Sequence, residues 1–283
     1  MKATNKIFTV DVEDYYHAEN VWTSLSKQQR GSVKSRVDIG TEKILDLLAQ
    51  SGNKATFFVL GCIAEGNKEL IKKISDEGHE IATHGYLHKP LWKHTSETFE
   101  AGLEKSLKIL FDITGQKIIG YRAPSFSLSK VTNWVFDILE KHGIVYDSSI
   151  SPSLFRSTFK NIKRAPFCFK ISKAIQEFPI TCFRKGSLEI PMGGGYFRML
   201  PYRITKMGLN SKGRREGDPV IFYIHPWELD SQQPRIKMSY VKAVRHYGNI
   251  NNTEQKLKRL LNEEHFVSIK AFIKNTKLIE DRI

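Results

Sequence analysis

The chain has 283 residues, 40% of them hydrophobic, and 44 Lys and Arg against 30 Asp and Glu give it a net charge of +14. This length suits a single large core, because α/β barrels of this size are commonly one domain. The charge favours an anionic partner or a basic surface, but the basic residues are scattered and not interleaved with aromatic residues, which argues against a nucleic-acid-binding protein.

The cysteines and the hydrophobic runs exclude further classes. Cys62, Cys168 and Cys182 are an odd number with no C-x-x-C pair, which argues against a disulfide framework and a structural zinc knuckle. No apolar run approaches the ~20 residues of a membrane-spanning helix. The first ten residues, MKATNKIFTV, lack the apolar region of a signal peptide. We therefore expect a cytoplasmic protein that can touch the inner face of a membrane.

Strand-like and helix-like segments alternate through the first half of the chain. Several of the predicted helices stop at a glycine and a strand follows within two or three residues, which is typical of βα units in a parallel sheet. The predicted strands are 6–12, 54–61, 79–85, 117–124, 144–150 and 219–228, and the predicted helices are 37–52, 67–78, 95–115, 130–143 and 252–266.

The alternation breaks between residues 151 and 200, where Phe, Pro and Gly are more frequent. This composition predicts an elaborated loop or extra strands over one face. No repeat or linker divides the chain. The sequence thus predicts one α/β domain over residues 1–283, with a core at about 5–230 and a helical or strand extension at 231–283.

Ionisable residues follow the predicted strands at the point where each strand ends. In parallel α/β barrels the functional groups gather at this end. The residues in these positions are Asp11, Glu13 and Asp14, His84 and His88, Arg122, Asp147, and His225 with Trp227 and Glu228.

His84 and His88 are four residues apart, a spacing that lets two imidazoles on one helical turn reach one ion. Two imidazoles and a carboxylate leave open positions on a divalent ion, as in a catalytic metal site. We expect Asp14 to be the carboxylate ligand. Glu13 is the rival ligand, because strand alternation points it to the same side as Asp11.

A second carboxylate near the ion can accept a proton from metal-bound water. Asp11, last on its strand, is the expected base, oriented by Arg122. His225, on a separate strand, is the candidate that could protonate a leaving group. The aromatic face of Trp227 suits a sugar ring at the mouth of a site, although a place in the core is the alternative.

The order of these motifs resembles the polysaccharide deacetylase family, also called the NodB-homology family or carbohydrate esterase family 4. The matching stretches run from about residue 5 to 230: the acidic cluster, THGYLH, YRAPSFS, YDSSI and YIHPWE. FTVDVEDYYH, IPMGGGYFRMLP and IHPWELDSQQPR further resemble the branch found beside exosortase and exopolysaccharide gene clusters. The resemblance implies a distorted (β/α) barrel, usually of seven strands, and hydrolysis of the N-acetyl group of an amino sugar.

The resemblance also implies roles for single residues. Asp11 corresponds to the family's base, His84 and His88 to its metal ligands, Arg122 to the arginine that holds the base, and His225 to the general acid. The metal is usually Zn²⁺. The family's paired Asp-Asp is spread here to D-V-E-D, which leaves the ligand open between Asp14 and Glu13.

Two further positions follow from the same comparison. Asp147 is expected to orient His225, although Ser149 and Ile150 stand where the family often has a second Asp and a Trp. Backbone N–H groups near Ser125 are expected to share the oxyanion with the metal.

The substrate is less defined by the sequence. Without an export signal, a nucleotide-linked or polyprenyl-linked N-acetylated sugar fits the positive charge. Tyr196 and Arg198, in the stretch GGGYFR, are candidates for binding it, and the alternative is a tight glycine turn with an exposed arginine. Hydrolysis of a formyl or other amide group, and a glycan-binding barrel without turnover, remain alternatives to deacetylation.

Overall fold

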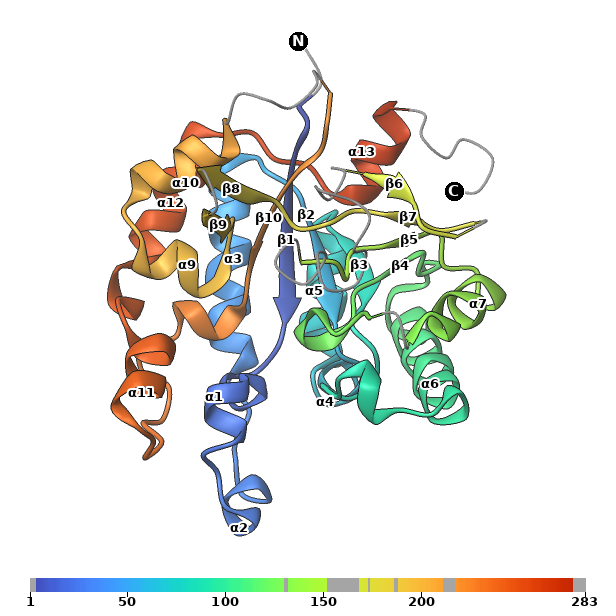
Figure 1. Ribbon diagram of the computed structural model, residues 1–283, viewed down its shortest axis with the longest axis horizontal. Helices are drawn as coiled ribbons and strands as arrows, with labels where there is room; N and C mark the ends of the chain where they lie inside the picture. Colours follow the sequence, from blue (N-terminus) through green and yellow to red (C-terminus); the bar gives the residue numbers. More distant parts are fainter. Residues whose placement is uncertain are drawn as a thin grey trace.

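The structure is a computed structural model that describes residues 4–129, 132–151, 168–172, 174–185, 188–210 and 217–276. Its centre is an eight-stranded sheet in the order β10-β1-β2-β3-β4-β5-β7-β6 (Figure 1). Seven of these strands run parallel, the number expected for the barrel, and β6 is antiparallel. The strands are β1 (Lys6–Val12), β2 (Ala55–Val59), β3 (Glu80–Thr83), β4 (Gly120–Tyr121), β5 (Tyr146–Asp147), β6 (Phe169–Lys170), β7 (Gln176–Glu177) and β10 (Val220–Ile224).

Helices cover the outer face of the sheet, as βα units require (Figure 1). Helix α3 ends at Gly52 and α6 at Gly115, both with φ +66°, so the predicted glycine stops are confirmed. No helix among the described residues is long and apolar enough to cross a membrane. The helices of the first half are α1 (Glu19–Trp22), α2 (Lys27–Arg30), α3 (Val37–Ser51), α4 (Gly61–Gly66), α5 (Lys68–Asp76), α6 (Ser96–Thr114) and α7 (Trp134–Lys141).

Strand β1 shows how the sheet positions a site. Its side chains alternate between two hydrophobic clusters: Phe8, Val10 and Val12 pack on the helix-covered side, and Ile7 packs on the other side. The alternation places Asp11 on the same side as Ile7, in the interior of the curved sheet. A buried carboxylate there needs a positive partner.

The second half of the chain belongs to the same sheet. Strand β10 pairs with β1 in parallel register, Val10 opposite Ile224, and β7 pairs with β5. The extra strands expected between residues 151 and 200 are present as the antiparallel pair β8 (Cys182–Lys185) and β9 (Leu188–Pro191), while residues 152–167 lie outside the described part. The later helices are α9 (Gly194–Met199), α10 (Tyr202–Leu209), α11 (Tyr240–Tyr247), α12 (Thr253–Glu263) and α13 (Ile269–Thr276).

Candidate metal and acid–base site

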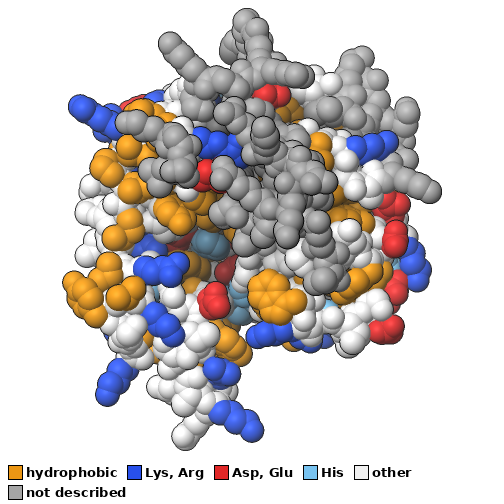
Figure 2. Space-filling view, in the orientation of Figure 1, with side chains coloured by type: hydrophobic (Ala, Val, Ile, Leu, Met, Phe, Trp, Pro, Cys, Tyr) orange, Lys and Arg blue, Asp and Glu red, His pale blue; other side chains and the backbone are white. Residues whose placement is uncertain are grey.

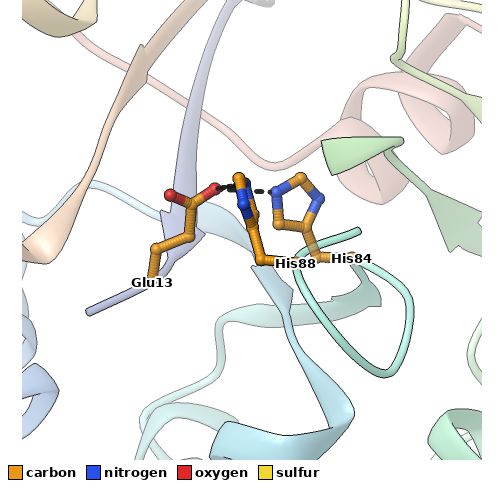
Figure 3. Close-up of side chains that lie close together, drawn as sticks. All are labelled: Glu13, His84 and His88. Atoms are coloured by element: carbon orange, nitrogen blue, oxygen red, sulfur yellow. Dashed lines mark hydrogen bonds and ion pairs between the residues drawn. The ribbon is translucent and has the colours of Figure 1, made fainter. Parts of the chain in front are cut away.

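Three side chains converge beyond the ends of β1 and β3 (Figure 3). Glu13 Oε1 lies 3.0 Å from His84 Nε2 and 2.9 Å from His88 Nε2. All three residues are largely buried, with side-chain exposures of 5%, 1% and 11%. Figure 2 shows a hollow in this face in which histidine and acidic side chains are visible.

The protonation of His84 indicates what this cluster can hold. His84 Nδ1 lies 2.7 Å from the backbone carbonyl oxygen of Arg122, which can only accept, so Nδ1 carries a proton. In the neutral imidazole, Nε2 therefore directs its lone pair at the Glu13 carboxylate. Two electron-pair donors at this distance need a positive charge between them, either a proton or a cation. The donor set, two imidazole nitrogens and a carboxylate oxygen, fits a divalent cation such as zinc.

The same charges determine the ionisation of Glu13. Burial by itself raises the pKa of this carboxyl group, but the histidines, His88 foremost, hold the pKa well below its usual value. Glu13 is therefore ionised at neutral pH, as a metal ligand must be.

The loop that carries the two histidines is not the helical turn that their spacing predicts. The chain from His84 to His88 is irregular, and Gly85 has φ +80°. The carbonyl of Gly85 accepts a hydrogen bond from the N–H of Gly61, and the carbonyl of Tyr86 accepts one from the N–H of Cys62. These two hydrogen bonds hold the loop against the first turn of α4. They, and not the spacing of a helical turn, bring His84 and His88 together.

Glu13, and not Asp14, stands beside the histidines. Asp14 caps the short 3₁₀ helix Tyr15–His17, and its carboxylate accepts hydrogen bonds from the hydroxyl of Ser35 and the backbone N–H of Arg36. The expected ligand assignment to Asp14 is corrected by this geometry. The physical reason is that Asp14 is the residue at which the chain leaves the extended conformation, so its side chain turns back to the following helix.

Asp11 and Arg122 form a buried pair in the interior of the sheet. Arg122 Nη1 donates to Asp11 Oδ1 at 2.6 Å, and Arg122 is 0% exposed. The guanidinium also donates to Thr9 Oγ1 and to the carbonyl and hydroxyl of Ser148. Arg122 therefore fixes one oxygen of Asp11, and the other, Oδ2, lies 4.0 Å from His225 Nε2.

His225 follows β10 and is held by a residue that the sequence analysis noted but gave no role. Glu228 Oε1 lies 2.7 Å from His225 Nδ1, and Glu228 Oε2 accepts a hydrogen bond from Arg198 Nε at 2.7 Å. Burial lowers the pKa of His225, but the bond with Glu228 and the charges of Glu13 and Asp11 outweigh it and raise the pKa to about 9. His225 is therefore a protonated acid at neutral pH, with its Nε2 facing Asp11.

Asp147 does not take the orienting role expected for it. It is buried beside Glu177 and hydrogen-bonded by the hydroxyl of Ser149, while His225 is bonded to Glu228. The i to i+3 spacing in H-P-W-E was the signal for this replacement, because a 3₁₀ turn over Pro226–Leu229 brings Glu228 back to His225.

One of the expected substrate contacts, Arg198, is also corrected. Arg198 is 1% exposed and donates to Glu228 and to the carbonyls of residues 245, 246 and 248, so it is a structural residue and not an exposed ligand for an anion. Trp227 stacks against His225 at 5.3 Å and against His246 at 4.5 Å and is partly exposed, so its contact with a sugar stays a prediction.

The other two substrate candidates are accessible. Ser125 is exposed and has φ +57°, in the left-handed region that residues other than glycine rarely adopt. Tyr196 is 50% exposed. Both remain candidates for contacts with a ligand.

Comparison with protein-family models gives two matches that divide the chain. Residues 34–146 match the model described as polysaccharide deacetylase, and residues 148–274 match a domain of unknown function, DUF3473. The first match contains His84, His88 and Arg122, and the second contains Arg198, His225 and Glu228. The site is therefore assembled from both matched segments and from Asp11 and Glu13, which precede them.

Known proteins show similarity to parts of the sequence and to the whole fold. A peptidoglycan deacetylase from Helicobacter pylori is 36% identical over 113 residues, which are 40% of this chain and 38% of that protein. The chain thus spans about two fifths of the relative's length.

Two solved structures match nearly the whole chain. A Mycobacterium smegmatis protein assigned to the polysaccharide deacetylases has a TM-score of 0.62 at 19% identity, over 97% of this chain and 90% of its own. A Bacillus anthracis protein described as a pseudoenzyme of carbohydrate esterase family 4 has a TM-score of 0.50 at 14% identity, over 95% and 64%. Identities this low show a shared fold.

Proposed function

Residues 34–146 match the polysaccharide deacetylase model, and the chain shares its fold with a solved structure assigned to those proteins; from this premise we propose that the protein hydrolyses the N-acetyl group of an amino sugar. The observation that carries the proposal is the convergence of Glu13, His84 and His88 beside the pair Asp11 and His225. Residues suited to a cation, a base and an acid thus border one hollow. A glycan-binding protein would need no such combination.

We assign Glu13, His84 and His88 as the ligands of a divalent cation, most simply Zn²⁺. Such an ion, when bound, polarises an acetyl carbonyl and lowers the pKa of water. The chain brings the three donors together. The carbonyl of Arg122 orients the His84 ring, and Glu13 Oε1 lies within 3.0 Å of Nε2 of both His84 and His88.

Asp11 acts as the general base in this proposal. One of its oxygens is occupied by Arg122, so Oδ2 is the atom that accepts a proton from the attacking water. The Arg122 guanidinium keeps Asp11 in place without rotamer freedom, because it is itself bonded on three sides and stacked over Phe58.

His225 acts as the general acid. Its Nε2 lies 4.0 Å from Asp11 Oδ2, so an amide group that lies over both residues would have the attacking water beside Asp11 and its nitrogen beside His225. The protonated imidazole donates to the departing sugar amine, and acetate and a free amine are the products.

The proposed substrate is an N-acetylated sugar of surface polysaccharide synthesis. The DUF3473 match accords with the exopolysaccharide branch that the motifs resemble, which supports a role in the synthesis of a surface polysaccharide. A nucleotide-linked or polyprenyl-linked sugar in the cytoplasm, reached at the inner membrane face, suits the net charge of +14.

Acetate release tests the function directly. The protein is incubated with UDP-N-acetylglucosamine, polyprenyl-linked N-acetyl sugars and chitin oligomers, with and without added Zn²⁺, beside Asp11→Asn and His84→Ala. Metal-dependent acetate release that both variants lose is the expected result. Formate release from an N-formyl sugar would replace acetyl with formyl as the substrate group. If the protein bound glycans but hydrolysed none of these substrates, it would be a glycan-binding barrel without catalytic activity.

A further inference from the structure

Two basic segments lie side by side next to the site. Residues 20–37 and 231–249 each contain four Lys or Arg and no Asp or Glu: Lys27, Arg30, Lys34, Arg36, Arg235, Lys237, Lys242 and Arg245. Helices α1 and α11 are in contact, and Lys242 Nζ donates to Thr23 Oγ1 at 3.0 Å. Arg36 pairs with Asp230, and none of the other seven forms an ion pair with a described acidic residue.

Exposed hydrophobic side chains stand among these cations. Tyr240 is 83% exposed, Val241 67% and Val244 37%, and their spacing puts them on neighbouring positions of α11. Trp22 on α1 is 41% exposed beneath the guanidinium of Arg30, and Met199 on α9 is 45% exposed. We call these five residues, with the seven unpaired cations, the basic apolar surface. Figure 2 shows basic and hydrophobic side chains in the region where Figure 1 places α1, α2 and α11.

The side chains of this surface indicate which kind of partner can bind there. Aliphatic side chains such as Val241 and Val244 gain nothing from a hydrated glycan or a phosphate backbone. A second copy of the chain docked symmetrically would bring like charges together. An anionic bilayer offers phosphates for the cations, an apolar layer for the valines, and the interface that Trp and Tyr prefer.

We propose that the basic apolar surface docks on an anionic phospholipid bilayer. The attraction combines burial of Tyr240, Val241 and Trp22 with the charge of the surrounding Lys and Arg. Docking requires both, because a single weak signal gives only marginal membrane binding.

The surface is continuous with the candidate site. Tyr15, Val21 and Leu25 form a buried cluster against which Trp227 and Ile236 pack, so the segments of the surface rest on the neighbours of Glu13 and His225. A cavity of about 440 Å³ lies between the same segments, lined by Tyr15, Lys34 and Ile236 among others. Docking therefore brings the edge of the site to the bilayer. That this position gives access to a lipid-linked sugar rests on the proposed function.

Vesicle sedimentation tests the proposal without any reference to catalysis. The full chain is mixed with vesicles of phosphatidylcholine alone, or with about one third phosphatidylglycerol. Two variants change the surface: Tyr240→Ser with Val241→Ser, and Lys237→Glu with Arg245→Glu. Two matched controls change exposed residues elsewhere: Met207→Ser on α10, and Lys68→Glu with Lys258→Glu on α5 and α12. Gel filtration verifies folding and oligomeric mass.

The expected result is binding to the anionic vesicles only, weakened by salt, reduced about tenfold or more in both surface variants and little changed in both controls. Absence of binding by the unchanged protein, equal binding to both vesicles, or equal losses in surface and control variants would overturn the proposal. So would a change of oligomeric mass in the surface variants, which would assign the surface to a second copy. Acetate release from a water-soluble oligomer is measured in parallel, so failure of docking and failure of catalysis are separate results.

Discussion

The buried carboxylate of Glu228 joins two side chains: Oε1 lies 2.7 Å from His225 Nδ1, and Oε2 lies 2.7 Å from Arg198 Nε. Arg198 is in turn held by three backbone carbonyls at the end of α11. The orientation of His225 is therefore determined within the second half of the chain, although the base that it faces is on β1 and the charges of Glu13 and Asp11 also raise its pKa.

Replacing Glu228 by Gln is expected to lower the pKa of His225, because the imidazolium loses its nearest negative charge. A general acid is active while protonated, so the alkaline limb of the pH–rate profile moves to lower pH. At pH 8 we expect kcat to fall by about 10². The profile is measured beside Glu254→Gln, a partly exposed carboxylate paired with Lys43. An unchanged alkaline limb in Glu228→Gln would show that Glu228 does not set the ionisation of His225.

Arg198→Ala is expected to destabilise the fold by about 3–5 kcal/mol, because it leaves the carboxylate of Glu228 buried without its cation. The double variant with Glu228→Gln should recover part of this loss, since the stranded charge is gone. Urea unfolding of the two single variants and the double variant measures the coupling. Additive losses would mean that the two side chains do not interact.

The two acidic residues at the end of β1 are expected to differ in metal binding. Glu13→Gln should lose most of its bound zinc, as it removes a charged donor between His84 and His88. Asp14→Asn should retain zinc and lose no more than about 1 kcal/mol of stability, because Asn can also cap a helix. Metal content by mass spectrometry, with urea unfolding, distinguishes them. Zinc retained in Glu13→Gln and lost in Asp14→Asn would return the ligand assignment to Asp14.

Asp147 and Glu177 form a buried carboxyl pair, and burial raises the pKa of both. A carboxyl pKa that is higher in the folded than in the unfolded state adds stability at low pH, which is lost as pH rises through the folded values. Glu177→Gln removes one of the two titrating carboxyl groups and leaves an amide that can donate to the Asp147 carboxylate. The free energy of unfolding of this variant should therefore rise relative to the unchanged protein as the pH increases above the ordinary range of carboxyl pKa values, by about 1 kcal/mol or more.

Urea unfolding at several pH values measures this difference, and Glu42→Gln, an exposed carboxylate, is the control. A difference that stays constant with pH, or shrinks as pH rises, would contradict the raised pKa values. The charge of Arg122 opposes the rise in the pKa of Glu177, but burial outweighs it.

Much of the fold and the membership of the site were accessible from the sequence. The glycine stops and the buried strands predicted the parallel sheet, and the rule that polar groups gather at strand ends identified Asp11, His84, His88, Arg122 and His225. Asp11 lies on β1, and His84, Arg122 and His225 directly follow β3, β4 and β10, whereas His88 belongs to the irregular loop after β3. Sequence reasoning served best where the backbone is regular.

The errors share a physical origin in irregular backbone. The side to which Glu13 and Asp14 point depends on where β1 ends, and a shift of one residue exchanges them. Glu228 reaches His225 only through a 3₁₀ turn, and Arg198 is buried only because α11 covers it. Helix α11 lies in the segment 231–283 that was predicted only as a helical or strand extension, and its hydrophobic residues Tyr240, Val241 and Val244 are exposed rather than directed at a core.

The pairing of β10 with β1 has a consequence for the making of the protein. On the ribosome β1 emerges well before β10, because the strands β2 to β9 lie between them in the sequence. Until then one edge of β1, with its unpaired N–H and C=O groups, is open to other strands, as in any exposed sheet edge. His225 arrives with the strand that closes this edge. Protection from misassembly and completion of the acid–base pair are therefore a single late event in the life of each chain.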